Sequence, residues 1–168
     1  MSEAQLRAWF NYVDKDGSGT VTCQELQTAL VQANIRVSLE SCAMLIRMYD
    51  SKRSATVNYD EFRNLHNFIL SVQQSFYGYD VDRNGKLDSR EIWLALQKNG
   101  FNLDMPAFDA AFKAFDPTNS GFLELDDFIC LAAYLSSAKS MFTAFDPQNS
   151  GSITMNFSQF IYASSHLR

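Results

Sequence analysis

Apolar residues recur along this chain at helical spacing. The first four stand at positions i, i+3, i+4 and i+7 and so line one face of an α-helix: Leu6, Trp9, Phe10 and Val13. A polar, acidic segment begins at Asp14, and helical spacing of apolar residues resumes over 26–30. The pattern therefore predicts two helices joined by a polar loop.

The same plan returns four more times along the chain. The polar segments, called loops 1 to 5, begin at Asp14, Asp50, Asp80, Asp116 and Asp146. Each has an apolar residue four places before it, at Phe10, Ile46, Phe76, Phe112 and Phe142. Each also has one at its eighth position, at Val21, Val57, Leu87, Leu123 and Ile153. A repeat of this length predicts stacked helix–loop–helix units.

The spacing of the loops predicts how the units connect. Successive loops start 36, 30, 36 and 30 residues apart. The longer steps leave room for linkers over 34–38 and 99–104, with Ser38 as a helix N-cap and Gly100 at a helix end. The shorter steps leave none, so we predict continuous helices over Tyr59–Tyr79 and Leu125–Phe145.

The predicted fold class is all-α, with short β-bridges between paired loops. We expect one domain over 1–168, made of units at about 2–33, 39–69, 66–99, 104–135 and 135–166. Units 1 and 2 form one pair, and units 3 and 4 form the other.

Loop 3 carries the residues of an EF-hand calcium site. Ca²⁺ takes roughly six to eight oxygen ligands, and the EF-hand supplies them at fixed positions around a bend-forming glycine. Gly85 provides the bend, and the predicted ligands are Asp80, Asp82, Asn84, the Lys86 carbonyl, Asp88 and Glu91. Loop 1 matches equally well through Asp14, Asp16, Ser18, the Thr20 carbonyl, Thr22 acting through water, and Glu25. We predict calcium in both loops.

The other three loops are weaker. Loop 2 has Lys52 at a ligand position and Ala55 in place of the glycine, so we expect it to support loop 1 structurally. Loop 4 ends on Asp127, which is shorter than Glu, and this leaves weak Ca²⁺ or Mg²⁺ binding open. Loop 5 has Gln148 and Phe157 at ligand positions, and we expect it to hold no metal.

Five units leave one without a partner. An unpaired strand edge exposes backbone donors and acceptors. The segment around Ile153 has no partner in this chain, so a second copy of the same unit is the expected partner, in a two-fold dimer.

These features resemble the penta-EF-hand family. The resemblance rests on five units, the 36/30 spacing, a calcium-poor fifth loop, Phe-Asp-Pro at 115–117 and 145–147, and Asp-Asp-Phe at 126–128. They look like its group that includes programmed cell death protein 6 and peflin. The Gly/Pro-rich N-terminal extension common in that family is not found in this sequence.

Composition argues against several classes of function. A net charge of -5 argues against binding nucleic acid through phosphate contacts. Cys23, Cys42 and Cys130 lack metal-site spacing, and we expect reduced thiols in a cytoplasmic protein. No residue cluster indicates an enzyme, and we expect no membrane-spanning segment.

The loops and the resemblance together lead to three functional hypotheses. The first is a calcium sensor or adaptor that exposes a cleft for Pro-rich or hydrophobic peptides of trafficking proteins. This protein would dimerise through its fifth unit. Calcium-dependent association with a membrane stays open under this hypothesis. The second is a regulatory subunit that pairs with a calpain-like protease or another penta-EF-hand protein. The third is a calcium buffer, which three degraded loops argue against.

Overall fold

The computed structural model describes residues 1–165, so residue 166, the predicted end of the fifth unit, lies outside the described residues. The helices are α1 (Glu3–Val13), α2 (Cys23–Gln32), α3 (Leu39–Tyr49), α4 (Tyr59–Tyr79), α5 (Ser89–Lys98), α6 (Met105–Phe115), α7 (Leu125–Phe145) and α8 (Phe157–Ser165). Two short strands, β1 (Leu87–Asp88) and β2 (Phe122–Leu123), complete the fold. The predicted all-α class is confirmed.

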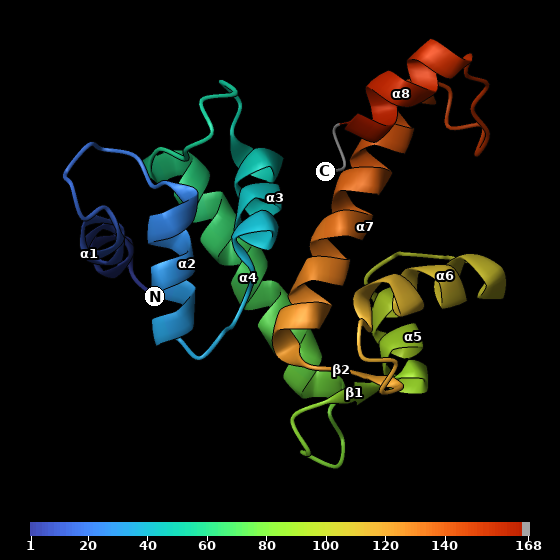
Figure 1. Ribbon diagram of the computed structural model, residues 1–168, viewed down its shortest axis with the longest axis horizontal. Helices are drawn as coiled ribbons and strands as arrows, with labels where there is room; N and C mark the ends of the chain where they lie inside the picture. The colour runs from blue at the N-terminus through green and yellow to red at the C-terminus, as the bar shows by residue number, and fades with distance from the viewer. Residues whose placement is uncertain (166–168) are drawn as a thin grey trace.

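Two long helices organise the molecule. Helices α4 and α7 have the bounds that the loop spacing predicts. Helix α4 runs between a half built from α1, α2 and α3 and a half built from α5 and α6, and α7 packs against α3, α4 and α6 (Figure 1). The C-terminal part of α7 carries α8 away from the rest of the molecule (Figure 1).

The loops pair as predicted. Val21 and Val57 exchange two backbone hydrogen bonds, with N···O distances of 2.8 and 3.0 Å, which joins loops 1 and 2. Strands β1 and β2 are antiparallel and place Leu87 opposite Leu123, which joins loops 3 and 4. All four of these side chains are fully buried. Each bridge therefore ties two loops together through the core.

Helix boundaries follow local capping chemistry. Ser38 accepts a hydrogen bond from the Ser41 backbone N–H and starts α3, as predicted. Gly100 follows α5 with a φ of +79°, a left-handed conformation that glycine adopts at low cost.

Helix α7 bears on the expectation that the chain has no membrane-spanning segment. It is long and apolar enough, by length and composition alone, to cross a membrane. Its N-terminal half, however, buries a continuous set of side chains in the protein core, from Phe128 to Ala133 and again at Leu135. We therefore interpret α7 as a core helix whose apolar character comes from packing on several sides.

Candidate metal-binding loops

The five loops share one backbone feature. Positions 4 and 6 have a positive φ in every loop, at Gly17 and Gly19, Arg53 and Ala55, Arg83 and Gly85, Asn119 and Gly121, and Asn149 and Gly151. The sequence pattern had indicated only position 6. The Gly or Asn at position 4 of loops 1, 4 and 5 is the signal that could have shown the other.

The first aspartate of each loop anchors the turn. All five are buried, at 6–9% exposure. In loop 1, Asp14 Oδ1 accepts from Ser18 N at 3.0 Å and Asp14 Oδ2 from Gly19 N at 2.9 Å. Loops 3, 4 and 5 repeat this pair of bonds. The position-1 carboxylate therefore organises the loop through its own backbone.

Loop 1 brings three carboxylates together. Single oxygen atoms of Asp14, Asp16 and Glu25 all lie within 4.8 Å of one another, the one such acidic group within residues 1–165. Hydrogen bonds from the Ser18 side chain and backbone lower the pKa of Asp16. An all-oxygen, anionic set of this kind matches a hard divalent cation such as Ca²⁺.

Glu25 closes loop 1 from the far end. Its Oε1 accepts from Lys15 N at 2.9 Å, and its Oε2 accepts from Thr22 N at 2.9 Å and Thr22 Oγ1 at 2.7 Å. Burial acts to raise the pKa of Glu25, but these hydrogen bonds together outweigh it and lower the pKa. The carboxylate therefore joins both ends of the loop to the first turn of α2.

The remaining predicted ligands of loop 1 line the same turn. Ser18 Oγ donates to the Thr20 carbonyl at 3.0 Å and lies 3.4 Å from Asp14 Oδ1. Thr22 is the N-cap of α2 and accepts from Glu25 N. All six predicted positions thus lie around one loop.

Loop 3 has the same plan in a more open form. Glu91 Oε2 accepts from Asp88 N at 3.0 Å, but Glu91 Oε1 is 3.4 Å from Val81 N, longer than the equivalent 2.9 Å contact in loop 1. Asn84 donates to Asp82 Oδ2 at 2.8 Å and accepts from Lys86 N at 2.7 Å. The loop 3 carboxylates do not converge as the loop 1 group does, so its metal site stays a prediction based on residue type and position.

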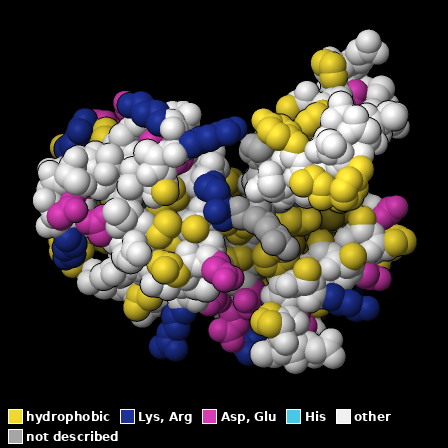
Figure 2. Space-filling view, turned by 45° about the horizontal axis from the view of Figure 1, so that its top comes forward, with side chains coloured by type: hydrophobic (Ala, Val, Ile, Leu, Met, Phe, Trp, Pro, Cys, Tyr) yellow, Lys and Arg dark blue, Asp and Glu magenta, His cyan; other side chains and the backbone are white. Residues whose placement is uncertain are grey.

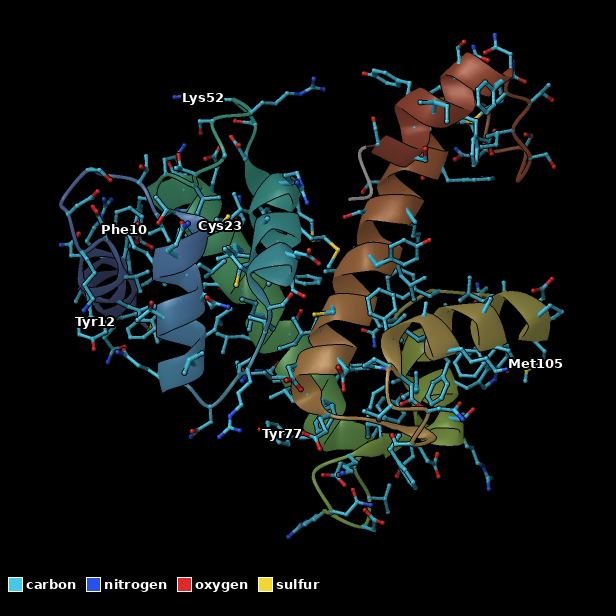
Figure 3. All side chains as sticks on the ribbon, viewed as in Figure 1. Phe10, Tyr12, Cys23, Lys52, Tyr77 and Met105 are labelled. Atoms are coloured by element: carbon cyan, nitrogen blue, oxygen red, sulfur yellow. The ribbon has the colours of Figure 1, made fainter. Side chains whose placement is uncertain are left out.

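Loop 2 has the conformation of a metal-binding loop but a poor set of ligand residues. Glu61 Oε1 accepts from Ser51 N at 3.0 Å, the bond that Glu25 makes in loop 1. Ala55 has a φ of +60°, which is strained for a residue with a Cβ. Lys52 points away from the loop into solvent (Figure 3).

Loop 4 lacks the closing bond. Within residues 1–165, Asp127 Oδ2 accepts a hydrogen bond only from Glu124 N, at 3.3 Å. The second loop residue is Pro117, which has no N–H to donate. Burial, with the nearby charges of Asp126 and Glu124, raises the pKa of Asp127. Glu124 itself pairs with Lys86 of loop 3 at 3.1 Å. These features make Asp127 a weaker metal ligand than its shorter side chain alone would.

Loop 5 departs furthest from the pattern. In the other loops the exit helix begins at position 10, and in loops 1, 2 and 3 the residues at positions 9 and 12 cap it reciprocally. In loop 5, Asn156 and Gln159 cap each other at 2.9 Å in both directions, and α8 begins two residues later, at Phe157. The Phe157 side chain is 77% exposed.

The chain resembles several proteins that share this architecture. Residues 71–133 match the family model for an EF-hand domain pair, and residues 6–31 match the model for an EF hand. The chain is 29% identical to penta-EF hand domain-containing protein 2 of Dictyostelium discoideum, over 92% of this chain and 75% of that protein. It is 31% identical to human peflin, over 95% of this chain and 57% of peflin.

The chain is also similar to a solved structure. A homolog of programmed cell death 6 protein from Leishmania major Friedlin is 35% identical, with a TM-score of 0.74. The similarity covers 97% of this chain and 94% of that one.

Proposed function

Because the chain belongs to the penta-EF-hand family, the group of peflin and programmed cell death protein 6, we propose that it is a calcium sensor that binds Ca²⁺ in loops 1 and 3. The observation that carries this proposal is the convergence of Asp14, Asp16 and Glu25. Bound Ca²⁺ would supply the charge that offsets the repulsion among these carboxylates. Glu25 lies in the first turn of α2, so closing the loop on the ion would reorient that helix.

The output of the sensor is the second part of the proposal. Movement of the loop 1 and loop 3 exit helices would expose an apolar cleft for Pro-rich or hydrophobic peptides. The chemistry is metal binding and association, without catalysis. Cytoplasmic location and calcium-dependent membrane association complete the proposal.

The solvent exposure of apolar side chains in the fifth hand supports dimerisation through it. The apolar position four residues before the loop is at most 9% exposed in loops 1 to 4, but Phe142 before loop 5 is 39% exposed. On α8, Phe160 is 57% exposed and Ile161 is 48% exposed. A second fifth hand, from the same chain or another penta-EF-hand protein, would cover this surface.

A dye and peptide assay tests the sensor proposal. Binding of anilinonaphthalene sulfonate and of a Pro-rich peptide is measured with Ca²⁺, with Mg²⁺ at the same concentration, and without either ion. We expect binding to increase with Ca²⁺. Equal binding in all three conditions would contradict the sensor.

Native mass spectrometry separates the two partner types. A stable homodimer favours the adaptor. A monomer that captures a different penta-EF-hand chain or a calpain-like protease favours the regulatory subunit.

A further inference from the structure

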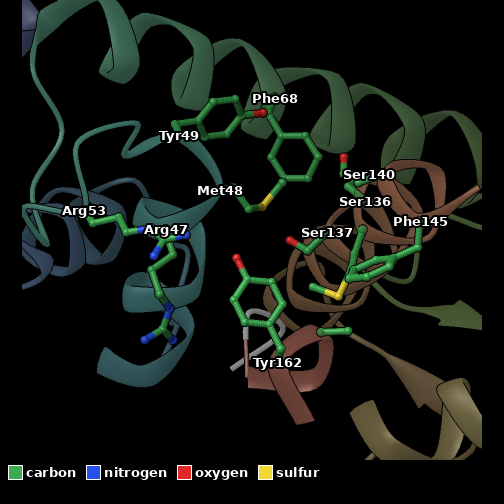
Figure 4. A pocket seen from close by; sticks show the side chains of 13 residues that line it. Arg47, Met48, Tyr49, Arg53, Phe68, Ser136, Ser137, Ser140, Phe145 and Tyr162 are labelled. Atoms are coloured by element: carbon green, nitrogen blue, oxygen red, sulfur yellow. The ribbon is translucent and has the colours of Figure 1, made fainter. Parts of the chain in front are cut away.

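A cleft separates the first two units from the end of α7. Its volume is about 560 Å³, within the usual range for ligand pockets. Met48, Tyr49 and Phe68 line it from α3 and α4, and the hydroxyls of Ser136, Ser137 and Ser140 line it from α7 (Figure 4). The cleft thus combines an apolar wall with a row of hydrogen-bonding groups.

The charge of this cleft is opposite to that of the whole chain. The chain has a net charge of -5, yet the described lining contains Arg47 and Arg53 and neither Asp nor Glu. Both guanidinium groups lie on the side of the cleft opposite Ser136 and Ser137 (Figure 4). Figure 2 shows Lys and Arg side chains at the edge of the hollow between the two halves, with hydrophobic side chains inside it.

Arg47 is available to a ligand. It projects from the last turn of α3, is exposed, and forms no ion pair with any residue from 1 to 165. An arginine fork binds a carboxylate through two parallel hydrogen bonds, which fixes the orientation of the bound group.

We propose that this cleft selects a protein segment in which an Asp or Glu lies next to an aromatic or large aliphatic residue. The inference rests on the proposed peptide-binding function and specifies its ligand. The carboxylate pairs with Arg47, and the apolar side chain packs against the wall formed by Tyr49 and Phe68, whose ring centroids lie 6.4 Å apart. The serine hydroxyls of α7 donate to carbonyl groups of the peptide backbone. The site is concave and its arginines lie beside an apolar wall. Such a site fits a side chain that inserts into it better than it fits a ligand with a flat anionic surface.

Selection from a random peptide library tests the proposal. Phage-displayed nine-residue peptides are selected, in the presence of Ca²⁺, against the full chain and against Arg47→Glu. We expect the unmodified protein to enrich Asp or Glu beside an apolar residue and Arg47→Glu to enrich Lys or Arg there. Arg36→Glu changes the charge equally on an exposed residue outside the cleft and should select as the unmodified chain does.

Affinity measurements on the selected peptides complete the test. Replacing the selected Glu by Gln should weaken binding about fivefold in the unmodified chain and have no effect in Arg47→Gln. Ser140→Trp, which fills the cleft without changing charge, should abolish binding.

Three outcomes would overturn the proposal. In the first, the unmodified chain and Arg47→Glu select the same sequences. In the second, only uncharged apolar peptides bind in a calcium-dependent way. This second outcome would leave the sensor proposal standing. Self-association that Arg47→Glu abolishes, without enrichment of acidic peptides, would assign the cleft to a second copy.

Discussion

At the residue scale, the last carboxylate of a loop has two roles. Glu25 and Glu91 are predicted metal ligands, and each also caps the helix that follows its loop. The capping bonds join groups of the protein itself, so these residues contribute to folding as well as to calcium binding. Substitutions must separate the two roles.

Glutamine and alanine should separate them. Glu25→Gln keeps the capping geometry, because Gln serves at this position as well as Glu, but it loses a charged bidentate ligand. Glu25→Ala loses both. We expect calcium-free denaturant unfolding to show a loss of about 1 kcal/mol for Glu25→Ala and little change for Glu25→Gln. Equal losses in the two variants would show that the cap contributes nothing.

His66 should make stability depend on pH. It lies on α4 with a buried Nδ1 that has no hydrogen-bond partner in the described chain, and burial lowers its pKa. The unfolded chain therefore binds a proton first as pH falls below about 6.5, so stability decreases there.

The corresponding measurement is unfolding of the calcium-free protein between about pH 7.5 and 5.5. We expect His66→Leu to flatten the decrease in the free energy of unfolding toward low pH. Parallel curves for the two proteins would exclude His66 as the cause.

At the element scale, the start of α8 distinguishes the fifth hand. The Phe157 side chain at position 12 cannot accept hydrogen bonds from backbone N–H groups, and Asn156 and Gln159 form the cap instead. The exit helix then begins two residues late and is not connected to the loop through a carboxylate. An ion in loop 5 would have no direct means of moving α8.

Removing the shifted cap should loosen α8. Asn156→Ala should increase hydrogen exchange of the α8 amides by an amount equivalent to about 1 kcal/mol. Thr154→Ala, at the position that would cap a regular hand, serves as the control and should leave exchange unchanged. Greater exchange in the control would mean that α8 begins where the other exit helices do.

The sequence predicted the long helices but not the start of α8. The bounds of α4 and α7 follow from loop spacing, because 30 residues leave no room for a break. The position of the last cap depends on a choice between two local hydrogen-bond pairs, which the repeat pattern alone does not decide. The convergence of Asp14, Asp16 and Glu25, against the more open loop 3, depends on side-chain geometry that residue types alone do not determine.

At the scale of the whole molecule, four hands bury their apolar positions against each other and the fifth does not. Val21, Val57, Leu87 and Leu123 are fully buried, whereas Ile153 stays partly exposed. The surface of hand 5 is therefore where assembly would bury further apolar area.

A charge on this surface should weaken assembly. We expect Ile153→Asp to shift sedimentation toward the monomer in analytical ultracentrifugation, because a desolvated carboxylate would have no partner. Val81→Asp makes the same change at a residue of loop 3 that is 81% exposed, and it should sediment as the unmodified chain does. A dimer that tolerates Ile153→Asp would place the interface elsewhere.

Calorimetric titration with calcium tests the central claim most directly. Ca²⁺ is titrated into the unmodified chain, Glu25→Gln, Glu91→Gln and the double variant. We expect each single substitution to remove one of the two strong sites and the double substitution to remove both. Two undiminished sites in the double variant would contradict the assignment of calcium to loops 1 and 3.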